Sequence, residues 1–303
     1  IYIICVSDSA IRVLRGSQGS MAWSLAWRHK WMLNIARALP QIPLERLEGL
    51  LSDFKRRAYD LGETGNTGDH YDLKLAMHRG DRVGAQAAFG RWQAGRRDDL
   101  SDCPACDAQQ VADYYAFLGD AAASVQAAER LLHRGQSCAE IPHVTYASLL
   151  PPLMRLGEWG KAAEYAALGR GMVAGDPDHL SSQADHLTYL ALTDRPAALG
   201  WYARHLPWAE QSRELLAVLQ FHKAAALLFR VWQDREGSSM PLTLPSGVPG
   251  FQPAGEYDAA ERYHYHLGEA QRIAALFDAR VGNTAKAEGI QEMLALAALT
   301  PSA

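Results

Sequence analysis

The chain has 303 residues, of which 48% are hydrophobic and 21% charged, and its formal net charge is −4. This is the composition of an ordinary globular protein, and the small charge with only short basic runs argues against a nucleic-acid partner. No apolar run approaches the roughly 20 residues that span a bilayer, so we expect no membrane segment. Four cysteines are few for a secreted disulfide scaffold, and we expect a cytoplasmic protein.

Residues 1–20 do not resemble the start of a native domain. They lack an initiating Met and end in the run RGSQGS just before Met21. The n-region, long apolar region and cleavage site of a signal peptide are also missing. We therefore expect a non-native or disordered segment here, with Met21 as the native start and no role for Cys5.

The first predicted helix covers residues 21–39. Tryptophan recurs every fourth residue from Trp23 to Trp31, which places the indoles on one helix face. Such a stripe can be a ligand platform, but we favour packing against a second helix. Residues 21–68 are then an N-terminal helical pair, with Pro40 at the end of its first helix.

A turn resembling Gly-Asp then recurs at a nearly fixed spacing. It reads Gly80-Asp81, Gly119-Asp120, Gly157-Glu158 and, more faintly, Thr193-Asp194. The turns lie 39, 38 and 36 residues apart. A period of this size without strand signals predicts an all-α fold of stacked helical hairpins, an α-solenoid.

The hairpins follow from these turns. The predicted helix pairs are 69–79 with 82–94, 107–118 with 121–134, 143–156 with 159–173, and 178–192 with 195–205. A small residue falls five positions after each turn, at Ala85, Ser124, Ala162 and Ala198. Small side chains there let two helices approach closely, while Pro151-Pro152 should kink or split its helix.

The C-terminal part, residues 211–303, is predicted to cap the array. A helix over about 212–232 is apolar nearly all round and should be buried. Residues 237–255 are rich in Pro, Gly and Ser and predict a long loop. A final helical pair over about 256–281 and 284–298 supplies the terminal helices that keep a solenoid soluble.

Residues 69–210 resemble the tetratricopeptide repeat (TPR) family. The likeness rests on the turns at residues 80, 119 and 157 and on Ala85, Ala162, Ala198, Phe89 and Tyr202. The period exceeds the family's 34 residues, and the terminal proline of the repeat is mostly absent. The stretches DDLSDCPACD, CAEIPHVTYA and FDARVGN also look similar to uncharacterised bacterial proteins of this repeat type. The resemblance implies a TPR-like scaffold that binds a protein or peptide.

The family's concave positions define a candidate peptide-binding groove. They fall on His70, Lys74, His78, Gln109, Asp113, Arg155 and Gln183. The set mixes hydrogen-bond donors with acidic and basic groups, as recognition of a peptide segment requires. A solvated inner face without a ligand is the alternative, and on either reading His70→Ala should leave stability intact.

Two short motifs predict a metal site. Cys103 and Cys106 form a CxxC motif, and Cys138 with His143 forms a C-x4-H motif. They lie in the two connectors that bracket the second hairpin, and both connectors emerge at the same end of a hairpin stack. Three thiolates and one imidazole are a closed tetrahedral set, so these residues predict structural zinc.

Other readings of the cysteines stay open. His133 or Asp102 is an alternative fourth ligand. CxxC pairs also occur in thiol–disulfide chemistry, so a redox sensor or enzyme using Cys103 and Cys106 is the second hypothesis, and inert thiols are the third possibility.

No sequence motif points to catalysis. The chain lacks GxSxG, P-loop, HExxH and strand-linked GxGxxG motifs, so we expect no enzyme. The leading hypothesis is a protein-binding helical scaffold. A regulatory domain cut from a larger signalling protein is a further alternative, suggested by the N-terminal residues.

Overall fold

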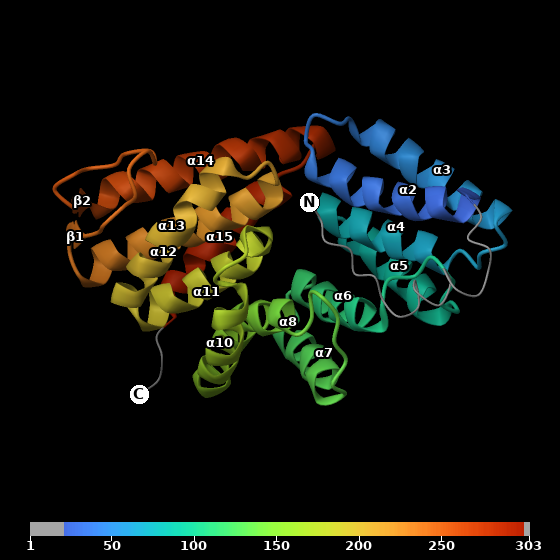
Figure 1. Cartoon of the computed structure of the whole chain (residues 1–303), viewed down its shortest axis with the longest axis horizontal. Helices are drawn as coiled ribbons and strands as arrows, with labels where there is room; N and C mark the ends of the chain where they lie inside the picture. The colour runs from blue at the N-terminus through green and yellow to red at the C-terminus, as the bar shows by residue number, and fades with distance from the viewer. Residues whose placement is uncertain (1–20, 300–303) are drawn as a thin grey trace. The chain divides into compact units, whose positions relative to one another are not determined.

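The computed structural model describes residues 21–299, which are almost entirely helical (Figure 1). The predicted all-α class is confirmed; a solenoid of TPR type stays a prediction. The expectation for residues 1–20 lies outside the described residues. Contacts divide the chain into two compact units, one holding the described residues up to Ile141 with Arg280–Gly282, the other the remainder. This boundary falls inside the predicted repeat region 69–210.

The first unit is built from successive helices. They are α2 (Met21–Ala38), α3 (Leu44–Asp60), α4 (Asn66–Arg79), α5 (Arg82–Ala94), α6 (Pro104–Phe117) and α7 (Ala121–His133). Helices α4 and α5 pack as one hairpin, and α6 and α7 pack as another. Ala26, Phe54, Tyr71 and Leu100 belong to one apolar cluster, which joins the N-terminal helical pair to α4 and to the connector before α6.

The Gly-Asp turns form the hairpins by two local interactions. Gly80 has φ 72° and Gly119 has φ 78°, the left-handed conformation that ends a helix and that glycine adopts without strain. The next residue begins the following helix: the Asp81 carboxylate accepts from the Gly84 N–H at 2.8 Å, and Asp120 accepts from Ala123 at 2.9 Å. One dipeptide thus ends one helix and caps the next.

The predicted close-approach positions are in the interior. The exposed fractions are 0% for Ala85, 3% for Ser124, 0% for Ala162 and 0% for Ala198. Burial of a small side chain at the same place in each hairpin supports the repeat reading of the sequence.

The second unit continues the helical pattern. Its elements are α8 (His143–Ser148), α9 (Leu150–Arg155), α10 (Trp159–Val173), η1 (Pro177–His179), α11 (Leu180–Thr193), α12 (Arg195–Gln211), α13 (Leu215–Arg235), β1 (Ser239–Pro241), β2 (Glu256–Asp258), α14 (Ala259–Val281), α15 (Ala285–Leu294) and η2 (Ala295–Ala298). The last residues of α14 belong to the first unit. The predicted helix over 143–156 is split into α8 and α9, and Pro151 lies in the first turn of α9. Its missing N–H costs no hydrogen bond there.

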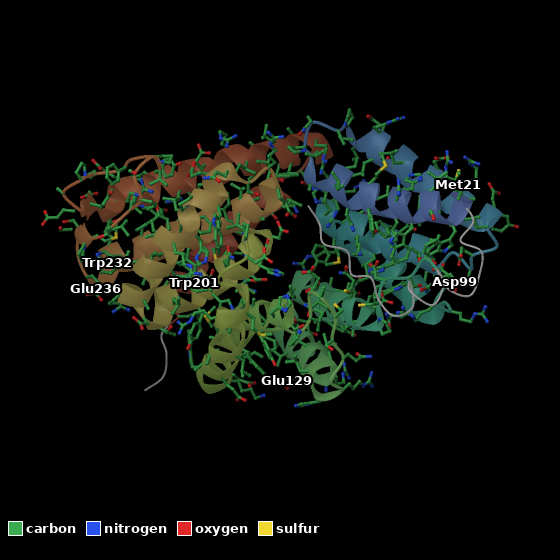
Figure 2. The ribbon with its side chains drawn as sticks, viewed as in Figure 1. Met21, Asp99, Glu129, Trp201, Trp232 and Glu236 are labelled. Carbon is green, nitrogen blue, oxygen red and sulfur yellow. The ribbon has the colours of Figure 1, made fainter. Side chains whose placement is uncertain are left out.

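The segment 237–255, predicted to be a plain loop, is tied to the core. Strand β1 at its start pairs antiparallel with strand β2 directly after it; Met240 faces Tyr257, and both side chains are buried. The indole N–H of Trp232, labelled in Figure 2, donates to the Ser239 carbonyl at 3.2 Å. The last turns of α13 therefore hold the start of this segment.

Helix α13 is the buried centre of the second unit. Among the described residues, it is the helix long and apolar enough to cross a membrane by length and composition, which corrects our expectation that no segment approaches that length. In the structure 72% of its apolar window is buried. A core helix passes the same test, so this finding leaves the predicted cytoplasmic location a prediction.

Candidate metal centre

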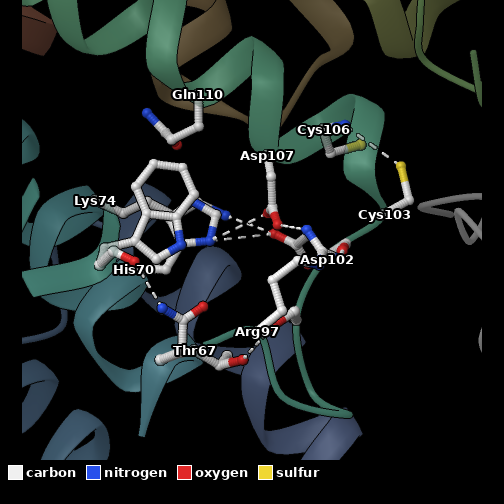
Figure 3. Close-up of polar contacts among 12 residues, drawn as sticks. Thr67, His70, Lys74, Arg97, Asp102, Cys103, Cys106, Asp107 and Gln110 are labelled. Atoms are coloured by element: carbon white, nitrogen blue, oxygen red, sulfur yellow. Dashed lines mark hydrogen bonds and ion pairs between the residues drawn. The ribbon is translucent and has the colours of Figure 1, made fainter. Parts of the chain in front are cut away.

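The CxxC motif begins α6. Cys103 caps the helix, because its Sγ accepts a hydrogen bond from the Cys106 backbone N–H, with 3.4 Å between S and N. Pro104 occupies the first helical turn, where its fixed φ suits the helix and its missing N–H costs nothing. The cap and the proline together bring the Cys103 and Cys106 side chains to one end of the helix (Figure 3).

Cys138 comes from the connector after α7. Its backbone N–H donates to the Ile141 carbonyl, with 3.1 Å between N and O, and this bond closes a tight turn. Its Sγ accepts from the Glu140 backbone N–H at 3.4 Å. The Ile141 side chain is buried and anchors the turn. An N–H directed at sulfur favours the thiolate, which is the form that binds metal.

The three sulfur atoms lie together. The Sγ atoms of Cys103, Cys106 and Cys138 are all within 4.8 Å of one another, and those of Cys106 and Cys138 are 3.7 Å apart. Zn–S bonds of about 2.3 Å in a tetrahedral site put neighbouring sulfurs about 3.8 Å apart. The three cysteines are therefore placed to hold one metal ion between the two connectors.

The thiols of the cluster affect one another. The neighbouring Cys103 and Cys138 thiols, and then burial, raise the pKa of the Cys106 thiol. A metal ion and a redox reaction both need the thiolate, so this shift favours neither role, and metal binding at neutral pH would displace protons from the cluster.

The fourth ligand stays a prediction. His143 begins α8 in the second unit, where its ring contacts His179 with 4.6 Å between centroids. Burial, followed by the nearby His179, lowers the pKa of His143. The alternative His133 is the exposed last residue of α7.

Asp102, the other alternative ligand, is engaged elsewhere. Its Oδ1 accepts from Lys30 Nζ at 2.8 Å and its Oδ2 from Lys74 Nζ at 3.0 Å (Figure 3 shows Lys74 and Asp102). Burial opposes ionisation of Asp102, but Lys74 and Lys30 still hold its pKa well below the usual range. The Lys30 side chain is completely buried. Sequence reasoning missed this lysine because its partner is 72 residues away.

His70 belongs to the same buried network. Its ring stacks on Trp92, with centroids 4.3 Å apart and planes 10° apart. Its Nδ1 lies 3.7 Å from Asp107 Oδ1 and 3.9 Å from Asp102 Oδ2, beyond hydrogen-bond distance. Burial, and then Lys74, lowers the pKa of His70 well below its ordinary value, so the ring is neutral.

His70, Asp102 and Asp107 are a second group whose ligand atoms lie close enough to hold an ion. However, Lys30 and Lys74 pair with Asp102, and Arg97 pairs with Asp107. Those cations already neutralise both carboxylates, and a divalent cation would be repelled by them. We therefore assign this group to an ion-pair network, whereas the three sulfur atoms of the cysteine group could hold a metal ion.

The predicted groove residues divide into two kinds. His70, His78, Gln109 and Gln183 are buried, and the Gln183 amide donates to the Val173 carbonyl at 2.7 Å. These four side chains pack in the interior and do not offer a solvent-facing surface. Lys74 and Asp113 are half-buried, and Arg155 is exposed. Burial raises the pKa of Asp113 to about 6, although its carboxylate accepts from Gln109 at 2.8 Å.

Comparison of the chain with family models, with curated proteins and with solved structures gives no match. The likeness to TPR proteins therefore rests on the turn spacing and the buried small residues alone.

Proposed function

We propose that this protein is a helical-repeat scaffold that binds a protein or peptide segment and carries a structural zinc ion at Cys103, Cys106 and Cys138; His143 as the fourth ligand rests on the C-x4-H motif of the sequence alone. The separation of 3.7 Å between the Cys106 and Cys138 sulfurs carries the metal part of the proposal. It equals, within about 0.1 Å, the sulfur spacing of a tetrahedral zinc site.

Zinc is favoured over other metals by the donors. Thiolates are soft ligands that select zinc or copper(I) over magnesium and calcium, which prefer oxygen. A structural role follows from where the donors come from, because one ion would connect the beginning of α6 to the turn after α7. The link would add to the apolar contacts by which Leu100 and Ile141 already hold the two connectors.

Elemental analysis of protein purified without chelator tests the metal assignment. We expect one zinc per chain and three thiols protected from alkylation until a chelator is added. A metal-free protein whose thiols all react at once would overturn it. A His143→Ala variant that keeps its zinc as tightly as the parent would remove His143 from the ligand set.

The scaffold part is supported by the repeated hairpins. A rigid helical array presents preformed side chains, so a partner pays little ordering entropy on binding. Among the predicted groove residues, Arg155 is exposed and Asp113 is half-buried.

Selection from a displayed random-peptide library against the zinc-loaded protein tests this part. We expect selected peptides to lose at least about tenfold in affinity with Asp113→Lys or with Arg155→Ala. Asp178→Lys is the matched control, because Asp178 is exposed and lies outside the predicted groove. Peptides that bind all variants equally would contradict the groove.

A thiol-based redox sensor is the second candidate function. The sequence hypothesis paired Cys103 with Cys106, whereas the 3.7 Å contact joins the Cys106 and Cys138 sulfurs. Oxidation by hydrogen peroxide would convert one thiol to a sulfenic acid, which condenses with the other thiol to a disulfide and water. Peptide mapping that finds a Cys106–Cys138 disulfide, formed only after the metal leaves, would favour this candidate.

A further inference from the structure

Lys30 is the most deeply buried cation of the first unit, and its partners lie beside the cysteines. Its side chain is 0% exposed, and its Nζ lies 3.5 Å from the centroid of the Trp27 ring. It donates to the Leu100 carbonyl at 2.7 Å and to Asp102 Oδ1 at 2.8 Å. A buried ammonium is costly unless it is paired and hydrogen-bonded, so these contacts determine where the lysine and its partners can lie.

Both partners of Lys30 belong to the connector between α5 and α6. The Leu100 side chain is 0% exposed and shares an apolar cluster with Ala26 and Leu33 of α2. Asp102 is joined by a peptide bond to Cys103, the first predicted metal ligand. Helix α2 therefore holds the connector by an apolar contact and by an ion pair within three residues of that ligand.

The residue that follows the CxxC motif is also fixed by an ion pair. Asp107 directly follows Cys106, and its carboxylate pairs with Arg97 of the same connector. The Arg97 guanidinium also donates to the Asp102 carbonyl. Carboxylates therefore flank the motif on both sides, and each is fixed by a cation, as Figure 3 shows for Arg97, Asp102 and Asp107. These contacts do not reach the cysteine side chains; they fix the backbone of the residues directly before Cys103 and directly after Cys106.

We propose that Lys30 is a positioning residue for the metal: its ion pair with Asp102 holds Cys103 in the geometry the metal requires, so that metal binding and the docking of α2 stabilise each other. This inference rests on the proposed metal function. Linkage makes the effect reciprocal, because a contact that strengthens metal binding is itself strengthened by the metal.

Titration of the metal-free full-length protein with Co²⁺ measures the effect, since thiolate-bound cobalt absorbs visible light. We compare the parent, Lys30→Met and the control Lys55→Met. Lys55 also pairs with an aspartate of another helix, Asp72, at 2.5 Å, and that pair does not involve the cysteine connectors. We expect Lys30→Met to bind cobalt 10- to 100-fold more weakly, while Lys55→Met stays within about twofold of the parent.

If circular dichroism shows that Lys30→Met does not fold, Asp102→Asn serves as a second variant. It preserves the shape of the side chain and removes its charge, and we expect a similar loss of cobalt affinity. In the double variant the loss should be smaller than the sum of the two single losses, because both changes break the Lys30–Asp102 pair. Asp102→Asn alone also weakens the pair with Lys74.

Hydrogen exchange provides a readout that a merely structural role would not change. Metal should slow amide exchange in α2 of the parent, and this protection should be lost in Lys30→Met. A parent that binds no cobalt would overturn the proposed metal function itself. Equal affinity and equal α2 protection in the parent and Lys30→Met would overturn the role of Lys30 and leave the metal site standing.

Discussion

The sulfur atoms of Cys106 and Cys138 lie 3.7 Å apart although 32 residues separate them in the chain. The hairpin of α6 and α7 lies between them, so its two ends meet at the sulfurs. A bond through one ion would close this hairpin and restrict its unfolded form as a cross-link does.

Cys138→Ala should therefore abolish stoichiometric zinc binding and destabilise the α6–α7 hairpin. A ligand that binds only the folded state adds about 2.7 kcal/mol when its free concentration is 100 times Kd, and this variant forfeits that contribution. Urea unfolding with and without zinc measures it. The control is Ser137→Ala, because Ser137 is an exposed neighbour in the same connector; this variant should be stabilised by zinc as much as the parent. A Cys138→Ala variant that contains as much zinc as the parent would contradict the site.

The sequence alone predicts that His70→Ala leaves the stability of the protein unchanged, whereas the structure predicts that this substitution destabilises it. The ring is 2% exposed and stacked on Trp92, so its removal leaves a cavity and loses an aromatic contact. We expect a loss of about 2 kcal/mol of unfolding free energy. His133→Ala, which removes an exposed histidine of the same unit, should change stability by less than about 0.5 kcal/mol. Equal effects in the two variants would show that His70 is not part of the core.

The sequence was most informative where one local rule decides the structure. The Gly-Asp turns predicted the ends of α4 and α6 and the beginnings of α5 and α7 to within about one residue, because a left-handed glycine and a capping aspartate act within four residues. The split between α8 and α9 at Leu149, two residues before Pro151, followed from the same local reasoning.

Long-range pairing was beyond sequence reasoning. The tryptophan stripe of α2 was expected to pack against a second helix, and Trp23 and Trp27 do pack on the apolar cluster that contains Phe54 of α3. The sequence did not predict that Lys30 on the same helix is fully buried. Its partner Asp102 lies 72 residues further along the chain. The short β-pair was also missed, although Met240, Leu242 and Leu244 alternate with polar or small residues, the signal of a strand with one buried face.

The capping aspartates give a direct test of the turn interpretation. Asp120→Ala removes the hydrogen bond from the Ala123 N–H. It should lower the free energy of unfolding by about 1 kcal/mol. Glu158 stands at the equivalent turn but leaves α10 without a side-chain cap among the described residues, so Glu158→Ala should cost less than half as much. Thermal unfolding of the two variants compares them. A larger loss for Glu158→Ala would mean that the turns are not equivalent.

Two helical glycines should respond in opposite directions to substitution by alanine. Gly90 lies inside α5, and a Cβ there would meet nothing within 4 Å. Gly90→Ala should raise stability by roughly 0.5–1 kcal/mol because alanine loses less backbone entropy on folding. A Cβ at Gly169 would lie 2.6 Å from the Tyr146 Cβ, so Gly169→Ala should destabilise α10. Stabilisation by both changes would show that α8 and α10 do not pack this closely.

Buried histidines should make the second unit sensitive to acid. Burial lowers the pKa of both His186 and His222 to about 4. The unfolded chain takes up protons at these rings near the ordinary pKa of 6.5, before the folded chain does, so stability is full above about pH 6.5 and falls as the pH drops towards 4. Each ring contributes a loss of at most roughly 3 kcal/mol.

Urea midpoints measured between pH 7.5 and 4.5 test this sign. Burial opposes protonation of His222 most strongly, Glu269 favours it, and Arg272 and Arg262 oppose it. The Nδ1 atom of His222 also lies 2.7 Å from Nδ1 of His266. His222→Gln keeps a polar side chain that does not titrate, and it should flatten the pH dependence even if it lowers stability at pH 7.5. His133→Gln changes an exposed ring and should leave the slope as in the parent. A parent whose stability is constant over this range, or rises as the pH falls, would show that these histidines are not buried in neutral form.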